Sequence, residues 1–587
     1  MLSSRRASLM LGGILLLFGV ATALATAWIV HQTYTPILFF DQWAVVNQLM
    51  QSDGHLSLAQ LWQLHNEHRI PWGKLAGEID LKAFGGRNIS LLVEIYTIQA
   101  MEALFFIWIL RRYRGLNLAG LMTAAGVFLF AMFFPIQIEN FYWGFQVAFV
   151  TLPFAAGVSL GALIVHSDLA ASSERPPWFS WPLGISLGGA ALAETSLASG
   201  ILIWPLLLLL SFVLRMPART KYLIAATGAV AGGAFLWGFH SPGNTAQPVD
   251  SLRHPIAVGK FVRALLAWSW DSSIPTGSLW PSLAQLCAAV AALVVVGAFV
   301  RMLWSRSIPD KLQLFLVANA VFLLGTAFVV ALGRMNFGIE QAIASRYQTI
   351  ALAFWGSFGA LLVLWRTGKA ADPAGLIEIQ IAALFLLLAS VPRFGASMEV
   401  ARAHQRSLAE SYAAVLEDPS NSGARGNFSP YPNFAEAHAY LGSHHLGVVD
   451  RDFVPEGILM TIDSSSRAQW KVDGFQTLPP EECVGHIDWV RLVPNQPDSV
   501  MAGGWSWTEK SSQRPGRVLL VLDDGRVVGS ARVSMRRPDV RQQIARVTEP
   551  NTGWRTEASL PRGRTLRVFI IADHSSACPV PNEFIRR

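Results

Sequence analysis

Apolar stretches long enough to cross a membrane alternate with short polar strings over the first two thirds of the chain. A helix needs roughly 20 apolar residues to span a bilayer. The pattern predicts eleven spans, at about 9–30, 90–110, 117–134, 147–165, 181–198, 200–214, 222–239, 281–300, 312–332, 350–365 and 376–391. The fifth and sixth are short, so they form either two tilted spans or one re-entrant pair. The pattern therefore predicts a polytopic α-helical membrane protein with about 11 transmembrane helices.

The pattern changes twice after the last apolar stretch. Residues 393–450 read as a soluble helical connector. Residues 451–587 carry short alternating runs divided by Gly, Asp and Pro, and Asp524-Gly525 between two Val-rich runs is typical of a hairpin turn. We therefore expect a transmembrane domain at residues 1–392, then the connector, then a soluble β-rich domain, which we expect to be a β-sandwich.

Two long loops interrupt the transmembrane domain. In the first, at residues 31–89, the apolar side chains of residues 55–72 share one broad face. This predicts an amphipathic helix lying in the membrane interface, with Pro71 ending it or starting the next helix. The second loop, at residues 240–280, predicts a helix whose two tryptophans suit the depth of the lipid headgroups: Trp268 and Trp270.

Lys and Arg gather at every second loop. These clusters lie at Arg5 and Arg6, Arg111 to Arg114, Arg215 to Lys221, Arg301 to Lys311, and Arg366 with Lys369. Because positive charge marks the cytoplasmic side of a membrane protein, the N-terminus is predicted to be cytoplasmic. The two long loops and everything after about residue 392 then lie outside.

The composition agrees with this assignment. The chain is 52% hydrophobic and only 14% charged, with a mean hydropathy of +0.38, which excludes a soluble globular protein of this length. The net charge of +7 includes the cytoplasmic clusters, and no basic stripe is interleaved with stacking aromatics. We therefore expect a lipid bilayer and no nucleic acid as a partner.

The three cysteines fall in two different environments. Cys287 lies inside a span, where we expect it to pack as a small apolar residue. Cys483 and Cys578 fall in the external region, where disulfides are permitted. We predict a bridge between them, and the alternative is two buried free thiols.

Four polar strings lie between the spans, and the charge rule places all of them outside. The first, FFDQW, carries Asp41 soon after the first span. A carboxylate at an apolar boundary is partly desolvated, which makes it a candidate general base. The alternative is that Asp41 caps the helix that follows it.

The second string, HNEHR, places two imidazoles, a carboxylate and a guanidinium within five residues: His65, Glu67, His68 and Arg69. On a helix the two histidines would point the same way. They do not have the i, i+4 spacing of a zinc protease, so we assign no metal ligand here, although a metal site is conceivable. Binding of a phosphate or a sugar hydroxyl fits His68 and Arg69 better. A solvated polar helix end is the alternative.

The third string, QIENFYWGFQ, sets Glu139 and Asn140 beside Tyr142 and Trp143. A carboxylate and an amide beside stacking aromatics can hold a sugar, with hydrogen bonds at its edge and a ring against its apolar face. The alternative is an interfacial aromatic belt whose polar groups are incidental.

The fourth string, GRMNFGIEQAIASRY, carries Arg334, Arg346 and Tyr347 at span ends. An arginine on the side of the membrane that carries few Lys and Arg residues is an exception to the rule that positive charge marks the cytoplasmic side. A bound phosphate or diphosphate at headgroup depth would explain it, because guanidinium binds phosphate oxygens in a fork. An internal ion pair with Glu340 is the alternative.

Taken together, these strings resemble the GT-C superfamily of membrane glycosyltransferases. The resemblance rests on an acidic residue in the external loop after the first span, on interfacial helices with polar strings, and on a soluble external domain after the last span. It is closest to the bacterial branch related to protein O-mannosyltransferases, aminoarabinose transferases and Gtr-type enzymes. Many relatives carry paired acidic residues near the first span, where this chain has Asp41-Gln42.

The resemblance implies a bacterial inner-membrane enzyme with a periplasmic active site. Its donor would be a sugar on polyprenyl phosphate, with a periplasmic glycan, lipid or protein as acceptor and a divalent metal as a possible addition. Asp41 would deprotonate the acceptor, and Arg334 or Arg346 would hold the lipid phosphate. Glu67, His68 and Glu139 are looser matches.

Two other functions fit a membrane protein with these polar loops. One is a transporter or flippase of lipid-linked saccharide, although such proteins usually show internal repeats and helices broken at mid-membrane. The other is a non-catalytic membrane protein whose β-rich domain binds glycan. The transferase is favoured because the halves of the chain are not similar and its polar strings lie in loops.

Overall fold

The computed structural model describes most of the chain. The described residues are 2–52, 54–113, 115–172, 178–240, 248–271, 279–367, 373–417, 426, 429, 431, 433–444, 446, 459–463, 472, 475–479, 482–493, 496, 498–508, 515–572 and 576–586. They form two compact units. The first holds residues 1–35 and 44–405, and the second holds residues 36–43 and 406–587.

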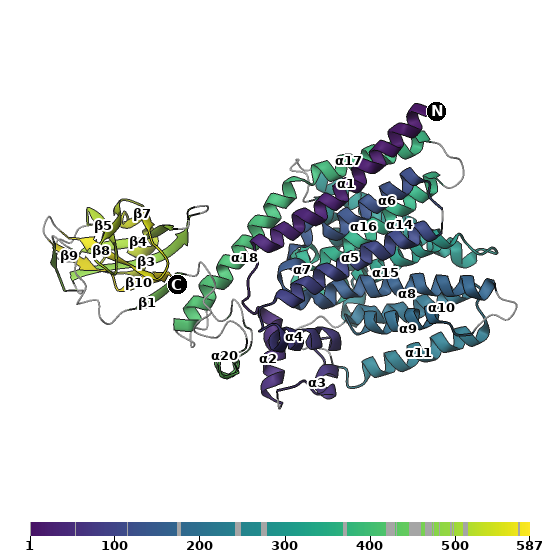
Figure 1. Ribbon diagram of the computed structural model, residues 1–587, viewed down its shortest axis with the longest axis horizontal. Coiled ribbons are helices and arrows are strands. Elements are labelled where there is room, and N and C mark those ends of the chain that lie inside the picture. Colours follow the sequence, from purple (N-terminus) through teal and green to yellow (C-terminus); the bar gives the residue numbers. More distant parts are fainter. Residues whose placement is uncertain are drawn as a thin grey trace. The chain divides into compact units, whose positions relative to one another are not determined.

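The first unit is a bundle of long helices (Figure 1). Within the described residues, eight helical segments are long and apolar enough to cross a membrane, so the chain is a multi-pass membrane protein. Their helices are α1 (Leu2–Gln32), α5 (Ile89–Arg112), α6 (Leu118–Phe133), α8 (Val147–Ala171), α14 (Leu279–Trp304), α15 (Lys311–Arg334), α16 (Gln348–Thr367), and α17 (Pro373–Ala389) with the start of α18 (Pro392–Glu417).

Three of the eleven predicted spans correspond to helices outside this set. They are α9 (Trp181–Glu194), α10 (Ile203–Val213) and α11 (Ala218–Leu236). Two of them are short, at 14 and 11 residues, because the chain turns between them through η4 (Ala198–Leu202). A Cβ at Gly200 would lie 2.0 Å from the carbonyl oxygen of Ala193, so this turn requires a glycine.

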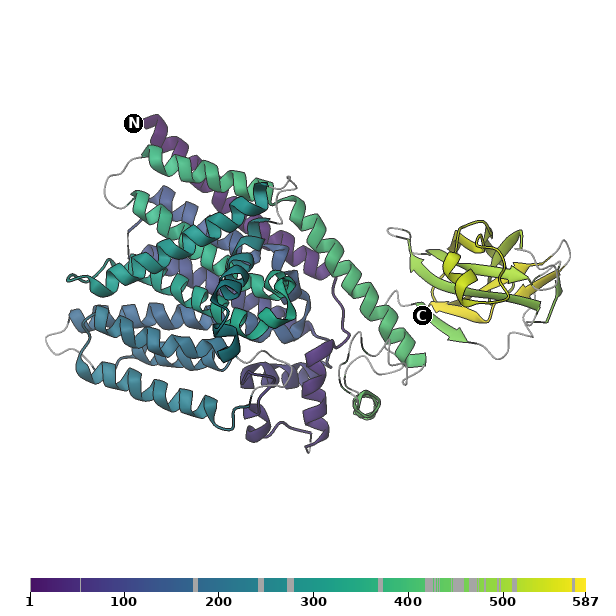
Figure 2. The same ribbon diagram turned by 180° about the vertical axis from the view of Figure 1, so that it is seen from behind.

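Close backbone approach holds the bundle together around α6. A Cβ at Gly126 of α6 would meet the backbone of Leu15 in α1 at 2.4 Å, and a Cβ at Gly19 would meet the carbonyl of Gly126 at 2.5 Å. Small residues at such crossings let membrane helices come close enough for their backbones to pack. Figure 2 shows the bundle from behind, where α1 runs along the outer side of the bundle.

The polar strings of the first unit and the loop helices at 248–271 lie at the end of the bundle away from the N-terminus (Figure 1). Their short helices are α2 (Trp43–Met50), α3 (Leu58–Trp62), α4 (Pro71–Ala83), η2 (Pro135–Gln137), α7 (Ile138–Tyr142), η3 (Gly144–Gln146), α12 (Pro248–Leu252), α13 (Pro255–Asp271), η5 (Met335–Phe337), η6 (Ile339–Ile343) and η7 (Ser345–Tyr347). Successive spanning helices run in opposite directions, so alternate connections lie at this end of the bundle.

The second unit is β-rich in its described C-terminal part. Its strands are β1 (Leu459–Asp463), β2 (Gln476–Thr477), β3 (Cys483–Leu492), β4 (Ser499–Thr508), β5 (Arg517–Leu522), β6 (Val527–Arg532), β7 (Gly553–Ser559), β8 (Arg564–Ile571), β9 (Ser576–Pro579) and β10 (Asn582–Arg586). Two helices accompany them: α20 (Phe434–Ser443) and α21 (Pro538–Gln543).

Among the described residues the strands form two sheets. The larger runs β1-β10-β8-β5-β6, with β9 beside β8 and β2 beside β9, and the smaller runs β3-β4-β7. Side chains from both sheets share one core, with Ile487 and Val500 from the smaller and Leu520 and Val568 from the larger. The predicted hairpin is confirmed, since β5 and β6 pair antiparallel around Gly525 at φ +88°.

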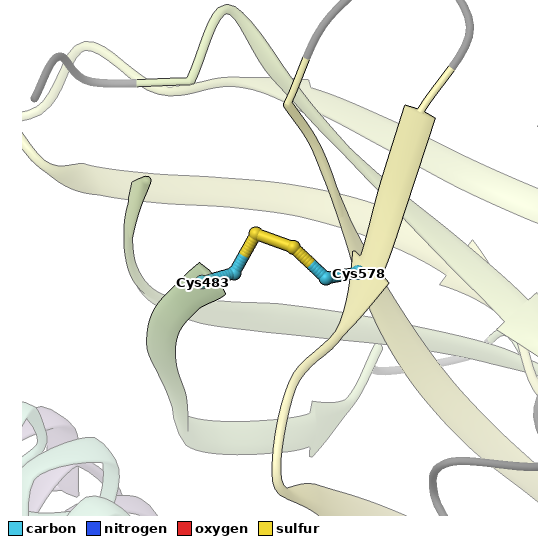
Figure 3. Close-up of a disulfide and its surroundings, with 2 residues drawn as sticks. All are labelled: Cys483 and Cys578. Atoms are coloured by element: carbon cyan, nitrogen blue, oxygen red, sulfur yellow. A yellow bond between two sulfur atoms is a disulfide. The ribbon is translucent and has the colours of Figure 1, made fainter. Parts of the chain in front are cut away.

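The predicted disulfide is also confirmed. Cys483 of β3 and Cys578 of β9 form a bridge with their Cα atoms 6.1 Å apart (Figure 3). It ties the smaller sheet to the larger one across 95 residues of sequence. Such a bridge restricts a long loop in the unfolded chain, and the bridge therefore stabilises the folded domain.

One expectation about a single residue is wrong, and another is left untested. Cys287 is exposed on α14 instead of packed in the bundle, because α14 turns this face away from its neighbours. Trp268 and Trp270 are half-buried against protein groups, and their position at headgroup depth stays a prediction. Their rings contact the Arg393 guanidinium at 5.9 Å and the Trp355 ring at 6.0 Å, respectively.

Candidate functional site

The HNEHR string is a tight turn, which corrects the expected helix over residues 55–72. Only Leu58–Trp62 is helical there, and Pro71 starts the next helix as one of the two predicted options had it. The backbones of His65 and His68 exchange two hydrogen bonds, at 2.8 and 2.9 Å. Asn66 takes φ +53°, a conformation that Asn tolerates at such turns. The two histidines are therefore paired across a turn and do not share a helix face.

This turn meets the end of α15 through an ion pair. The Glu67 carboxylate accepts a hydrogen bond from the Arg334 guanidinium, and the two side chains are only 21% and 23% exposed. The pair joins residues 267 positions apart. Glu67, and not Glu340, is therefore the ion-pair partner of Arg334.

His68 extends the same cluster. The backbone N–H of Ala198, at the start of η4, donates to Nδ1 of His68 at 3.0 Å. A nitrogen that accepts carries no proton, so the ring proton is assigned to Nε2. Nε2 faces the carboxylate of Glu67 at 3.6 Å. His68 is thus oriented by backbone on one side and faces an acidic group on the other.

The Arg69 side chain binds backbone carbonyls and so has a structural role. The residue is 4% exposed, and its guanidinium donates to the carbonyl oxygens of Trp62, Phe235 (2.8 Å) and Trp237. These carbonyls end α3 and α11, so Arg69 fastens the first loop to the end of α11. Burial lowers the pKa of Arg69. The guanidinium expected to bind phosphate is instead engaged with backbone carbonyls.

A second ion pair joins the third and fourth strings. Glu139 of α7 accepts from the Arg346 guanidinium at 2.9 Å and from the backbone N–H of Arg346 at 3.2 Å. The side chains are 15% and 29% exposed. Ser345 donates its hydroxyl to the carbonyl of Ile136 at 2.8 Å, which fixes the same two segments together. Arg346 thus pairs with Glu139, again not with Glu340.

Behind this pair lies a buried chain of amides and hydroxyls. Asn140 donates to the carbonyl of Arg346 at 3.0 Å and to the Thr349 hydroxyl at 2.6 Å. Thr349 donates to Gln137, which also accepts from Gln99 of α5 at 3.1 Å. Gln99, Gln137 and Thr349 were not predicted as site residues. A signal was present, because an amide inside an apolar stretch needs a buried partner.

The candidate aromatic residues of the third and fourth strings have little free surface. Trp143 is 7% exposed and lies 5.5 Å from the ring of Phe145, and Tyr347 is 4% exposed. Tyr142 is half-buried and stacks on His404 at 4.2 Å. The ring of His65 lies 5.0 Å from Phe145, so these aromatics also connect the second string with the third.

Several polar atoms at this end of the bundle are buried with no hydrogen-bond partner among the described residues. They include Oε2 of Glu67, Oδ1 of Asn140 and both side-chain polar atoms of Gln146. An unpaired buried polar atom costs about 1–3 kcal/mol, so such atoms usually bind water or a ligand. Their position beside the two ion pairs makes this end of the bundle a candidate site for a polar ligand.

Asp41 belongs to the second unit, whereas the other eleven candidate residues belong to the first. It lies in the short helix η1 (Phe40–Gln42), and the ring of Trp43 packs edge-on against Phe434 of α20 at 4.8 Å. Burial and then the nearby Asp41 carboxylate raise the pKa of Tyr431 to about 12. Tyr431 was not predicted. A pocket shared by Asp41 and the two arginines stays a prediction.

No protein-family model matches the chain, and a search of curated proteins finds no match. Among the described residues, no three His, Cys, Asp or Glu side chains are grouped closely enough to hold a metal ion.

Proposed function

We propose that the chain is a GT-C-type glycosyltransferase that moves a sugar from a polyprenyl-phosphate carrier to a glycan, lipid or protein acceptor outside the membrane. The observation that carries the proposal is the pairing of carboxylates and guanidiniums from separate loops at one end of the bundle, Glu67 with Arg334 and Glu139 with Arg346. Segments more than 200 residues apart converge there, beside buried polar atoms that suit a ligand rich in hydroxyls.

The chemistry needs one group at each face of the sugar. The acceptor hydroxyl attacks the anomeric carbon, its proton passes to Asp41, and the bond from that carbon to the phosphate oxygen breaks. Polyprenyl phosphate leaves with the negative charge, which Arg334 or Arg346 stabilises. Each arginine has five N–H donors, so each retains donors beyond those in its ion pair.

Glu67, Glu139 and their arginines form a rigid frame in this proposal. A carboxylate that is hydrogen-bonded to a guanidinium fixes the direction of that guanidinium. The arginines would then meet the phosphate in a set geometry. His65, His68, Asn140 and Tyr142 would contact the sugar or acceptor from the loops that carry them.

The proposal includes a topology. We propose that α9, α10 and α11 also cross the membrane, which gives eleven spans, and α9 and α10 lie alongside α8 in support (Figure 1). The N-terminus would be cytoplasmic, the membrane would be a bacterial inner membrane, and the C-terminal domain would be a periplasmic β-sandwich. The shared core of its two sheets supports the sandwich.

Reporter fusions test this topology. Fusions after residues 41, 144 and 340 should report the periplasm, and fusions after residues 113 and 217 should report the cytoplasm.

The decisive experiment is sugar transfer by purified full-length protein with a polyprenyl-phosphate sugar as donor. We expect Asp41→Asn to abolish transfer and to leave donor binding unchanged. Asp250→Asn is a matched control, because Asp250 is another external carboxylate and pairs only locally with Arg253 at 3.2 Å. Undiminished transfer by Asp41→Asn would remove this residue from the mechanism. Movement of the donor across liposomes without transfer would assign the chain to the transporters.

A further inference from the structure

A cavity of about 440 Å³ lies beside the external helix α13 in the first unit. From α13 it is lined by Lys260, Phe261, Arg263 and neighbouring alanines, from α14 by Gln285, and from the fourth polar string by Met335 and Ile339. Lys260 and Arg263 are three residues apart, so they lie on one face of the helix. The cavity therefore combines two cations with a largely apolar wall.

The helix is held so that these cations face outward. Val258, Phe261 and Leu265 are at most 3% exposed and pack into the core of the bundle. Lys260 and Arg263 are exposed on the other side. An amphipathic helix with this division lies at a membrane surface with its cations at headgroup depth.

Lys260 and Arg263 have no anionic partner among the described residues, unlike three other arginines of these loops. Arg334 pairs with Glu67, Arg346 with Glu139, and Arg253 of the same loop with Asp250. Two cations side by side without a carboxylate attract a doubly charged anion, and a phosphomonoester carries nearly two charges at neutral pH. A guanidinium also matches phosphate oxygens in geometry.

We propose that Lys260 and Arg263 bind the phosphate of a lipid whose hydrocarbon chain lies along the apolar wall formed by Ala264, Met335 and Ile339. A lipid fits better than a soluble anion because the wall is apolar and because α14 and α15, which border the cavity, are candidate membrane spans. None of the four residues of the Glu67–Arg334 and Glu139–Arg346 pairs lines this cavity, and the proposal does not depend on sugar transfer.

The test is binding to purified full-length protein in neutral detergent. Three probes separate the possible sources of affinity: farnesyl phosphate has head and tail, inorganic phosphate has the head alone, and farnesol has the tail alone. We expect farnesyl phosphate to bind at least 10-fold more tightly than either of the others. The double variant Lys260→Gln/Arg263→Gln should lose at least 10-fold in affinity for farnesyl phosphate and bind farnesol as the wild type does.

Two further variants keep the result interpretable. Arg253→Gln removes a cation of the same loop that is already paired, and it should bind farnesyl phosphate as the wild type does. The swap Lys260→Arg/Arg263→Lys keeps both charges and should stay within about 3-fold of the wild type. Equal binding by the Gln double variant and the wild type would overturn the proposal. Equal binding of inorganic phosphate and farnesyl phosphate would overturn the assignment to a lipid.

Discussion

The Glu139–Arg346 pair offers the sharpest test of how the polar end of the bundle is held together. Its closest atoms are 2.9 Å apart, and both side chains are mostly buried. At an effective dielectric constant of about 20, the Coulomb attraction at that distance is roughly 6 kcal/mol. Desolvation of the two charges offsets about half of it. We therefore expect a net coupling free energy of about 2–3 kcal/mol.

A double-mutant cycle measures this coupling directly. Glu139→Gln and Arg346→Gln should each lower the free energy of unfolding by about 3 kcal/mol, because each leaves the other charge buried without its partner. The double variant should lose little more than either single variant. The assay is unfolding of the purified protein by titration with SDS in mixed micelles, followed by tryptophan fluorescence.

The matched control is Glu340→Gln. Glu340 is an exposed carboxylate in the same polar string as Arg346, and it forms no ion pair with a described residue. Its replacement should change the free energy of unfolding by less than about 0.5 kcal/mol. A coupling below about 0.5 kcal/mol between Glu139 and Arg346 would refute the reasoning, and so would a large effect of Glu340→Gln.

Three further predictions concern stability. Burial, and then the nearby Arg69 charge, lower the pKa of Lys74 to about 8. Between pH about 8 and 10.5 the unfolded chain therefore binds more protons than the folded one, so the free energy of unfolding should rise with pH by roughly 3 kcal/mol across that window. A series of unfolding curves over this pH range measures the rise, and Lys74→Met should abolish it. The double variant Cys483→Ala/Cys578→Ala removes a bridge that closes a loop of 95 residues, so it should destabilise the β-rich region by about 4.7 kcal/mol. The region should then be digested faster by protease, and an unchanged digestion rate would contradict this prediction. Arg69→Met removes hydrogen bonds to three backbone carbonyls and should lower the free energy of unfolding by about 3 kcal/mol. Arg253→Gln, which replaces an exposed arginine, should change it by almost nothing in the same unfolding assay.

The hydrophobic pattern alone was enough to predict most of the elements. Eight of the predicted spans correspond to helical segments that can cross a membrane, because a run of about 20 apolar residues is a local property of the chain. The Asp524-Gly525 hairpin and the Cys483–Cys578 bridge were predicted for similar reasons, from turn chemistry and from compartment.

The sequence also determined which residues of the polar strings carry charge, but only the tertiary structure decided which of them meet. Arg334 and Arg346 pair with Glu67 and Glu139, although Glu340 is nearer to both in sequence. An ion pair between residues more than 200 positions apart leaves no mark on a local pattern. The turn at HNEHR has the same cause, since its geometry depends on Arg69 reaching the carbonyls that end α11, and local spacing could not reveal those acceptors.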